Sequence, residues 1–159
     1  MDERGGWLRK ATKFTNGDWR QYRWEDAQWK PKVAGVRNVP YGLDRLRDDN
    51  KDELCFVFEG EKDAERAWHN GLIATCNVGG AGNWTDDLNQ YLTERTICIV
   101  PDNDDAGSKH ATKVQTSLRS SGIDCFILWD YRHGLNEKGD FSDWMDVNCN
   151  DFGKFRSLA

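Results

Sequence analysis

The sequence predicts an α/β protein with a mainly parallel sheet of about four strands, flanked by helices and preceded by a small β-rich extension. From residue 54 onward, short continuous apolar runs alternate with stretches of helical composition, which is the pattern of a parallel sheet buried on both faces. Before residue 44, short alternating segments rich in Trp and basic residues are typical of β-hairpins. We therefore expect a basic, Trp-rich hairpin extension over residues 1–44 and an α/β domain over residues 45–159.

The elements follow one another in a regular order. In "DWRQYRWEDAQWK", side chains alternate on both sides of a turn at "EDAQ", which predicts a hairpin, and "YGLDRLRDDN" predicts a connection with a short helix. Because strands and helices alternate after it, consecutive strands are expected to run parallel. The predicted strands are "LCFVFEG", "LIATCNVGG", "TICIVPD" and "DCFILWD", and the predicted helices are "EKDAERAWHNG", "NWTDDLNQYLTER" and "DAGSKHATKVQTSLRSSG".

The net charge of −5 is unevenly distributed along the 159 residues. Residues 1–40 hold nine Lys and Arg against five Asp and Glu, whereas the remainder holds 13 against 22. A basic segment joined to an acidic body is expected where the first part meets phosphate and the second binds cations.

The cysteine pattern and the hydropathy exclude several classes of protein. The five cysteines are widely spaced and form no C-x-x-C pair, so neither a zinc ribbon nor a disulfide framework is indicated, and a reducing cytoplasm is expected. No apolar run approaches the roughly 20 residues that span a bilayer, and the first residues lack the apolar segment of a secretion signal. The sequence therefore predicts no membrane contact.

Acidic residues gather where the predicted strands end. Glu59 ends the first strand of the domain, and Asp102 and Asp104 follow the third. If these strands are neighbours, the carboxylates lie at one edge of the sheet, where hard oxygen ligands suit Mg²⁺. Asp63, one helical turn after Glu59, is expected to face the same cleft. Alternatively, the Asp-rich stretch is a turn in which Asp104 or Asp105 caps the following helix.

Further acidic and basic positions bear on the choice between a metal site and other sites. In "GDFSDW", Asp140 and Asp143 are either further metal ligands or neighbours of a helix capped by Ser142. An EF-hand starting at Asp102 fails because Lys113 stands where a bidentate Glu is required. The chain has no GKS or GKT stretch, which excludes a P-loop. The three histidines, at positions 69, 110 and 133, are expected on helix or loop surfaces.

"FVFEGEKDA", "IVPDNDDAG" and "KGDFSDW", in this order, resemble the Toprim domain of topoisomerases and primases, and above all that of bacterial and phage primases and primase-helicases. The resemblance covers roughly residues 33–146 and includes the glycine loop "NVGGAG". It implies that Asp102 and Asp104 bind Mg²⁺ or Mn²⁺, and that Glu59 joins them or acts as the acid/base. It also implies that Asp63 is a supporting acid and that Asp140 or Asp143 supplies the later acidic motif as a metal ligand. Gly79, Gly80 and Gly82 are the expected phosphate loop.

The resemblance implies a DNA-replication enzyme of primase type that acts on single-stranded DNA with nucleoside triphosphates, in the cytoplasm of a bacterial or phage-infected cell. Two other functions remain open, a Toprim nuclease that uses the same acids and a non-catalytic module that binds DNA or protein. Primases of this type carry a zinc-binding module and often a helicase, so these are expected in trans or elsewhere in a longer protein.

The extension is the second candidate for nucleic-acid contact. Its basic residues interleave with Trp19, Tyr22, Trp24 and Trp29, so the aromatic rings either stack on bases or pack the hairpin onto the body. Two lysines of the α/β domain complete the basic set. The expected nucleic-acid contacts are Arg20, Arg23, Lys30, Lys32, Lys62 and Lys109.

Overall fold

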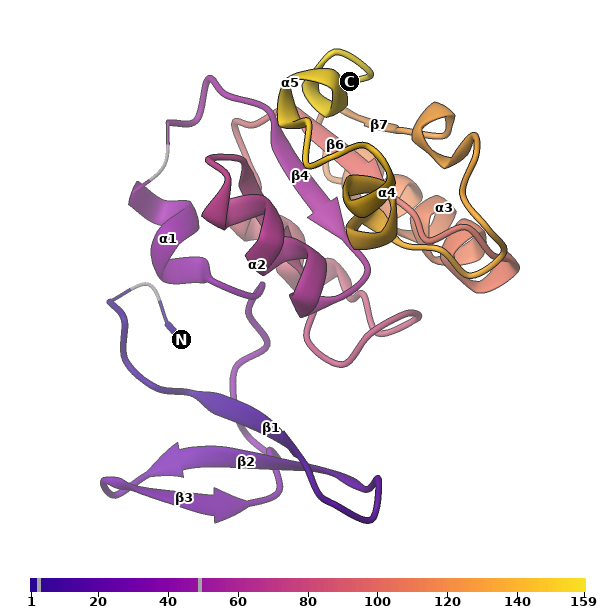
Figure 1. Cartoon of the computed structure of the whole chain (residues 1–159). Helices are drawn as coiled ribbons and strands as arrows, with labels where there is room; N and C mark the ends of the chain where they lie inside the picture. Colours follow the sequence, from indigo (N-terminus) through magenta and orange to yellow (C-terminus); the bar gives the residue numbers. More distant parts are fainter. Residues whose placement is uncertain (3, 49) are drawn as a thin grey trace.

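The computed structural model describes residues 1–2, 4–48 and 50–159, which form two separate sheets (Figure 1). A small antiparallel sheet has the strand order β1-β2-β3, and a larger sheet has the order β5-β4-β6-β7. All pairs in the larger sheet are parallel. The predicted fold class is confirmed. The strands of the larger sheet are β4 (Cys55–Phe58), β5 (Ile73–Cys76), β6 (Ile97–Val100) and β7 (Cys125–Ile127).

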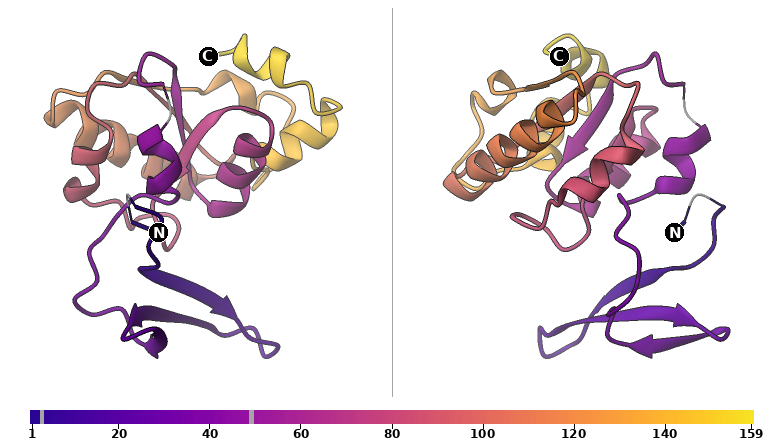
Figure 2. Two further views of the ribbon diagram at one scale, coloured as in Figure 1. Left: turned by 90° about the vertical axis from the view of Figure 1, so that its left-hand side faces the viewer. Right: turned by 180° about the vertical axis from the view of Figure 1, so that it is seen from behind.

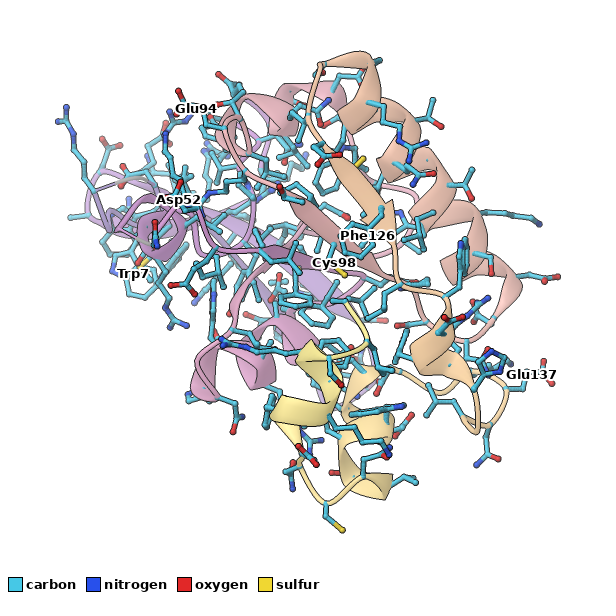
Figure 3. The ribbon with its side chains drawn as sticks, turned by 90° about the horizontal axis from the view of Figure 1, so that it is seen from above. Trp7, Asp52, Glu94, Cys98, Phe126 and Glu137 are labelled. Carbon is cyan, nitrogen blue, oxygen red and sulfur yellow. The ribbon has the colours of Figure 1, made fainter. Side chains whose placement is uncertain are left out.

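The larger sheet is buried on both faces, as its continuous apolar strands predict. Even-numbered side chains such as Phe56 and Cys98 pack under α2 (Glu61–His69), α4 (Phe141–Val147) and α5 (Phe152–Arg156). Odd-numbered side chains such as Val57 and Ile99 form a second cluster with α1 (Leu43–Asp48), the 3₁₀ helix η1 (Asp86–Tyr91) and α3 (Asp105–Ser120). Figure 2 shows the sheet between these layers, and Figure 3 shows Cys98 and Phe126 on the sheet from above.

The extension forms β1 (Arg9–Lys13), β2 (Trp19–Glu25) and β3 (Gln28–Pro31), one strand more than the predicted hairpin. The turn between β2 and β3 is made by Asp26 and Ala27, whose φ angles are 52° and 58°. Two consecutive residues with positive φ match the right-handed twist of a hairpin. Arg9 ties the small sheet to the segment before α1, because its Nη2 donates to Asn38 Oδ1 at 2.7 Å.

The helix predicted within "NWTDDLNQYLTER" is present as the 3₁₀ helix over residues 86–91. Two other local expectations are wrong. Ser142 does not cap α4, because Asp140 occupies the N-cap and accepts from the Asp143 backbone N–H. His110 is buried at 5 % exposure, since it lies on the side of α3 that faces the sheet and the glycine loop. Among the described residues, no helix is both long and apolar enough to cross a membrane.

Candidate metal centre

The acids predicted at the strand ends lie at one edge of the larger sheet. Glu59 directly follows β4, and Asp102 and Asp104 follow β6. Phe58 pairs with Val100 in parallel register, so the chain leaves both strands at the same level. These two strands are the central ones of the sheet. We use the name acidic rim for Glu59, Asp63, Asp102, Asp104, Asp140 and Asp143.

Three members of the acidic rim, Glu59, Asp63 and Asp102, have a raised pKa and hold their protons more tightly than ordinary carboxyls. Burial and then the charge of Glu59, followed by Asp63, Asp140 and Asp104, raise the pKa of Asp102 from 3.8 to about 8. Burial and then the charges of Asp104 and Asp63 raise the pKa of Glu59. Like charges in a partly dry site oppose ionisation until a proton or a cation neutralises them. The carboxylates of Glu59 and Asp102 therefore form a site at which a bound cation would be favourable.

Asp104 has a structural role as well as a place on the rim. It is the N-cap of α3, and its Oδ1 accepts a hydrogen bond from Gly107 N–H at 2.7 Å. Gly107 is required at this position because a Cβ there would lie 2.6 Å from the carbonyl oxygen of Asp102. The turn interpretation of the Asp-rich stretch and the rim interpretation are therefore compatible. Asp105 is the first residue of α3 and is exposed.

The other three acids use their oxygens within the protein. Asp63 is buried, and its Oδ1 accepts from the N–H and the hydroxyl of Ser142, with 3.0 Å to the nitrogen. Asp140 and Asp143 form a reciprocal capping box at the start of α4, with hydrogen bonds of 2.9 and 3.0 Å. Lys62 forms an ion pair with Asp140. The contacts of Asp63 with Ser142 and of Lys62 with Asp140 join α2 to the start of α4.

The loop that carries Asp102 is held by the segment after β7. Asn103 Nδ2 donates to the carbonyls of Leu135 and Asn136, at 3.1 and 3.0 Å. Arg132 Nη1 donates to the Asp102 carbonyl at 3.3 Å and to Ser108 Oγ at 3.0 Å. Arg132 was not selected from the sequence, and Ser142 was considered only as a helix cap, because only the tertiary fold brings them to Asp102 and Asp63. The glycine in "DNDDAG" was the available signal for Gly107.

The donor set fits a hard divalent cation. Carboxylate oxygens are the ligands that Mg²⁺ takes in proteins, and Glu59 Oε2 is buried with no hydrogen-bond partner among the described residues. In residues 1–2, 4–48 and 50–159, however, no three His, Cys, Asp or Glu side chains form a group that could hold a metal ion as they stand. Ligation by Glu59, Asp102 and Asp104 therefore stays a prediction, and it requires these side chains to close around the ion.

The glycine loop is positioned by α3. Gly79, Gly80 and Gly82 all have positive φ, between 75° and 98°. Gly82 N–H donates to His110 Nδ1 at 3.0 Å, and Lys113 Nζ donates to the Gly82 carbonyl at 2.8 Å. Because the Gly82 N–H already donates a hydrogen bond to His110, a phosphate bound here would be held by other groups of the loop. Phosphate binding by this loop stays a prediction.

The predicted basic residues have different surroundings. Arg23 and Lys30 form ion pairs with Glu25, at 3.2 and 2.9 Å. The Arg20 guanidinium lies 4.7 Å from the centre of the Phe14 ring. Lys32 and Lys109 are exposed. Trp19 was also predicted to contribute, but its side chain lies outside the described residues.

An open parallel sheet with carboxylates after its two central strands defines an α/β domain with an anionic site at its carboxyl edge. Residues 56–145 match the family described as Toprim-like, and the chain belongs to this family. The predicted resemblance is thus confirmed. No curated protein matches the sequence.

One solved structure with a similar fold is the "Crystal Structure of the primase fragment of Bacteriophage T7 primase-helicase protein". It superposes with a TM-score of 0.55 at 15 % sequence identity, over 95 % of this chain. The chain spans 61 % of the length of that fragment. At this identity the likeness concerns the fold.

Proposed function

We propose that this chain performs metal-dependent phosphoryl or nucleotidyl transfer on nucleic acid, as the Toprim part of a DNA primase. One observation carries the proposal. Glu59 and Asp102 follow the two central strands, and burial together with neighbouring acids raises the pKa of each: Asp104 and Asp63 act on Glu59, and Glu59 itself acts on Asp102. One Glu59 oxygen is also buried with no hydrogen-bond partner among the described residues. A divalent cation would satisfy both carboxylates, and Toprim-like membership supports this assignment.

In this proposal, Glu59, Asp102 and Asp104 hold Mg²⁺ or Mn²⁺. A bound divalent ion offsets negative charge on phosphate oxygens and lowers the pKa of a bound hydroxyl. Asp104 is oriented by its cap on Gly107, and Asp63 fixes the start of α4 through Ser142. Asp140 and Asp143 would act through this scaffold, since their oxygens already cap α4. Lys62 and Lys109 would contact the phosphates of the nucleic acid or of a nucleoside triphosphate.

The test supplies labelled single-stranded DNA, nucleoside triphosphates and Mg²⁺ or Mn²⁺. We expect oligoribonucleotide products, and we expect their loss in Glu59→Gln and Asp102→Asn. Asp105→Asn is the matched control, because it is an exposed carboxylate of the same stretch outside the burial that affects Asp102. Adding a zinc-binding module or a helicase in trans tests the expected partners.

The products also separate the alternatives. Shortened DNA in place of new oligonucleotides would assign the chain as a nuclease. Binding of DNA without any product, with and without the partners, would refute catalysis and leave a non-catalytic module. Products that survive in Asp102→Asn would contradict the acidic rim as the catalytic site.

A further inference from the structure

The two faces of the small sheet differ in chemistry. Strand alternation and the pairing of Lys10 with Tyr22, and of Trp24 with Trp29, place these four residues on one face together with Arg20. We call Lys10, Arg20, Tyr22, Trp24 and Trp29 the aromatic face. Within the described strands this face carries no acidic residue.

On the opposite face, Arg23 and Lys30 form ion pairs within the small sheet. Arg23 lies opposite Lys30, and both contact the Glu25 carboxylate. Lys30 also pairs with Asp26 at 2.6 Å, and Arg23 donates to the carbonyls of Pro31 and Lys32. These hydrogen bonds hold β2, β3 and the turn together. The side chains of Arg23 and Lys30 therefore stabilise the small sheet, although the sequence suggested both as nucleic-acid contacts.

The cations of the aromatic face are directed at rings instead. Lys10 Nζ lies 4.7 Å from the centre of the Trp29 ring and 5.5 Å from that of Tyr22, and Arg20 lies against Phe14. Neither cation has an ion pair within the described part of the chain. Lys10 was not among the residues selected from the sequence, because only the register of β1 against β2 places it here.

The rings of this face pack on one another and remain open to solvent. Trp24 and Trp29 have ring centres 5.0 Å apart, and Trp7 packs edge-on against Trp29 at 5.8 Å. Trp7 is 54 % exposed and Trp24 36 % exposed. Large exposed aromatic surface beside unpaired cations is unusual for a surface without a partner. Figure 3 shows Trp7 on the far side of the molecule from Glu137, a residue of the depression beside Asp104.

We propose that the aromatic face, extended by Trp7, binds single-stranded nucleic acid, with bases stacked on its tryptophans and phosphates near Lys10 and Arg20. Aromatic side chains accept any unpaired base by stacking, and cations follow the backbone. A duplex keeps its bases stacked inside and offers this face only phosphates. The proposal rests on the proposed function and deepens it by naming the surface that holds the single strand. Binding is measured without metal, so either proposal can fail alone.

The experiment measures fluorescence anisotropy of labelled oligo(dT) and of a matched duplex, in the presence of a chelator and at several salt concentrations. We expect tighter binding of the single strand, and about tenfold weaker binding after Trp7→Ala, equivalent to about 1.4 kcal/mol. Trp7→Phe should restore most of the affinity. The matched control is Trp129→Ala, since Trp129 is 39 % exposed and has the Arg132 guanidinium 4.6 Å from its ring centre.

The charges are tested by pairs of substitutions. Lys10→Gln with Arg20→Gln should reduce the log–log salt slope by about 1.4, because each phosphate contact on a single strand contributes about 0.7. Arg23→Gln with Lys30→Gln should leave the slope unchanged if the small sheet stays folded by circular dichroism. Equal loss in Trp7→Ala and Trp129→Ala, equal affinity for duplex and single strand, or no binding of either would each overturn the proposal.

Discussion

Asp102 should destabilise the metal-free protein at neutral pH. In the folded state burial and the neighbouring acids raise its pKa from 3.8 to about 8. An acid whose pKa is raised on folding binds its proton more tightly in the folded state, so the free energy of unfolding falls as the pH rises between these two values. At about 1.36 kcal/mol per pKa unit, the ceiling at pH 7 is about 4 kcal/mol. Because Asp102 retains contact with water, we expect about 1–3 kcal/mol.

Asp102→Asn removes this cost. In a chelator, urea denaturation at pH 7 should show the variant to be more stable than the wild type by that amount. Near pH 4 the difference should vanish, because Asp102 is then largely protonated in the folded protein and near its ordinary pKa when unfolded. Asp105→Asn, in the exposed first turn of α3, should change little at either pH.

Magnesium should narrow the difference in stability between the wild type and Asp102→Asn. A ligand at ten times its dissociation constant adds about 1.4 kcal/mol to the protein that binds it. We expect that gain, measured as an increase in the urea midpoint, for the wild type and not for Asp102→Asn. A variant that is less stable than the wild type at pH 7 without metal, or that differs equally at pH 4 and pH 7, would refute the electrostatic reasoning.

Three further outcomes are expected. Gly42→Ala should lower the free energy of unfolding by about 2–4 kcal/mol in urea, because Gly42 has a φ of 67° and a Cβ there would lie 1.6 Å from the Trp68 ring; an unchanged midpoint would contradict the Gly42–Trp68 packing. Asp104→Asn should keep the α3 cap and change thermal stability by less than about 0.5 kcal/mol, whereas Asp104→Ala should cost about 1 kcal/mol; equal stability of both would exclude the cap. Burial, and then the charge of Lys113, lowers the pKa of His110, so the wild type should lose stability as the pH falls below about 6.5. In the same urea titration His110→Asn should lose less stability. An identical pH dependence in the two proteins would show that His110 is not the cause.

The placement of the principal acids could be predicted from the sequence. Continuous apolar strands that alternate with helices imply a parallel sheet, and residues that follow such strands lie at its carboxyl edge. This rule, with the adjacency of β4 and β6, is enough to predict that Glu59, Asp102 and Asp104 lie at one edge of the sheet. The family resemblance rested on the same residues.

The hydrogen-bond partners of the other acids could not be predicted in this way. Ser142 is far from Asp63 in the sequence, and only the packing of α4 on α2 lets its N–H and hydroxyl bind that carboxylate. The capping box of Asp140 and Asp143 is local, but it competed with Ser142 as an equally good cap. His110 was expected at the surface because its burial depends on where the glycine loop folds.

The distribution of hydrogen bonds within the acidic rim identifies which carboxylates remain available for a cation. Backbone N–H groups donate hydrogen bonds to Asp63, Asp140 and Asp143. One oxygen of Asp104 accepts a hydrogen bond from the Gly107 N–H. Glu59 instead has a buried oxygen with no partner among the described residues. Burial is the first cause that raises the pKa of Glu59, Asp63 and Asp102, and neighbouring acids add to it at each of them. At Asp63 the hydrogen bonds from Ser142 act in the opposite direction. The buried Glu59 oxygen has no such bond among the described residues, so a cation would be most favourable beside Glu59.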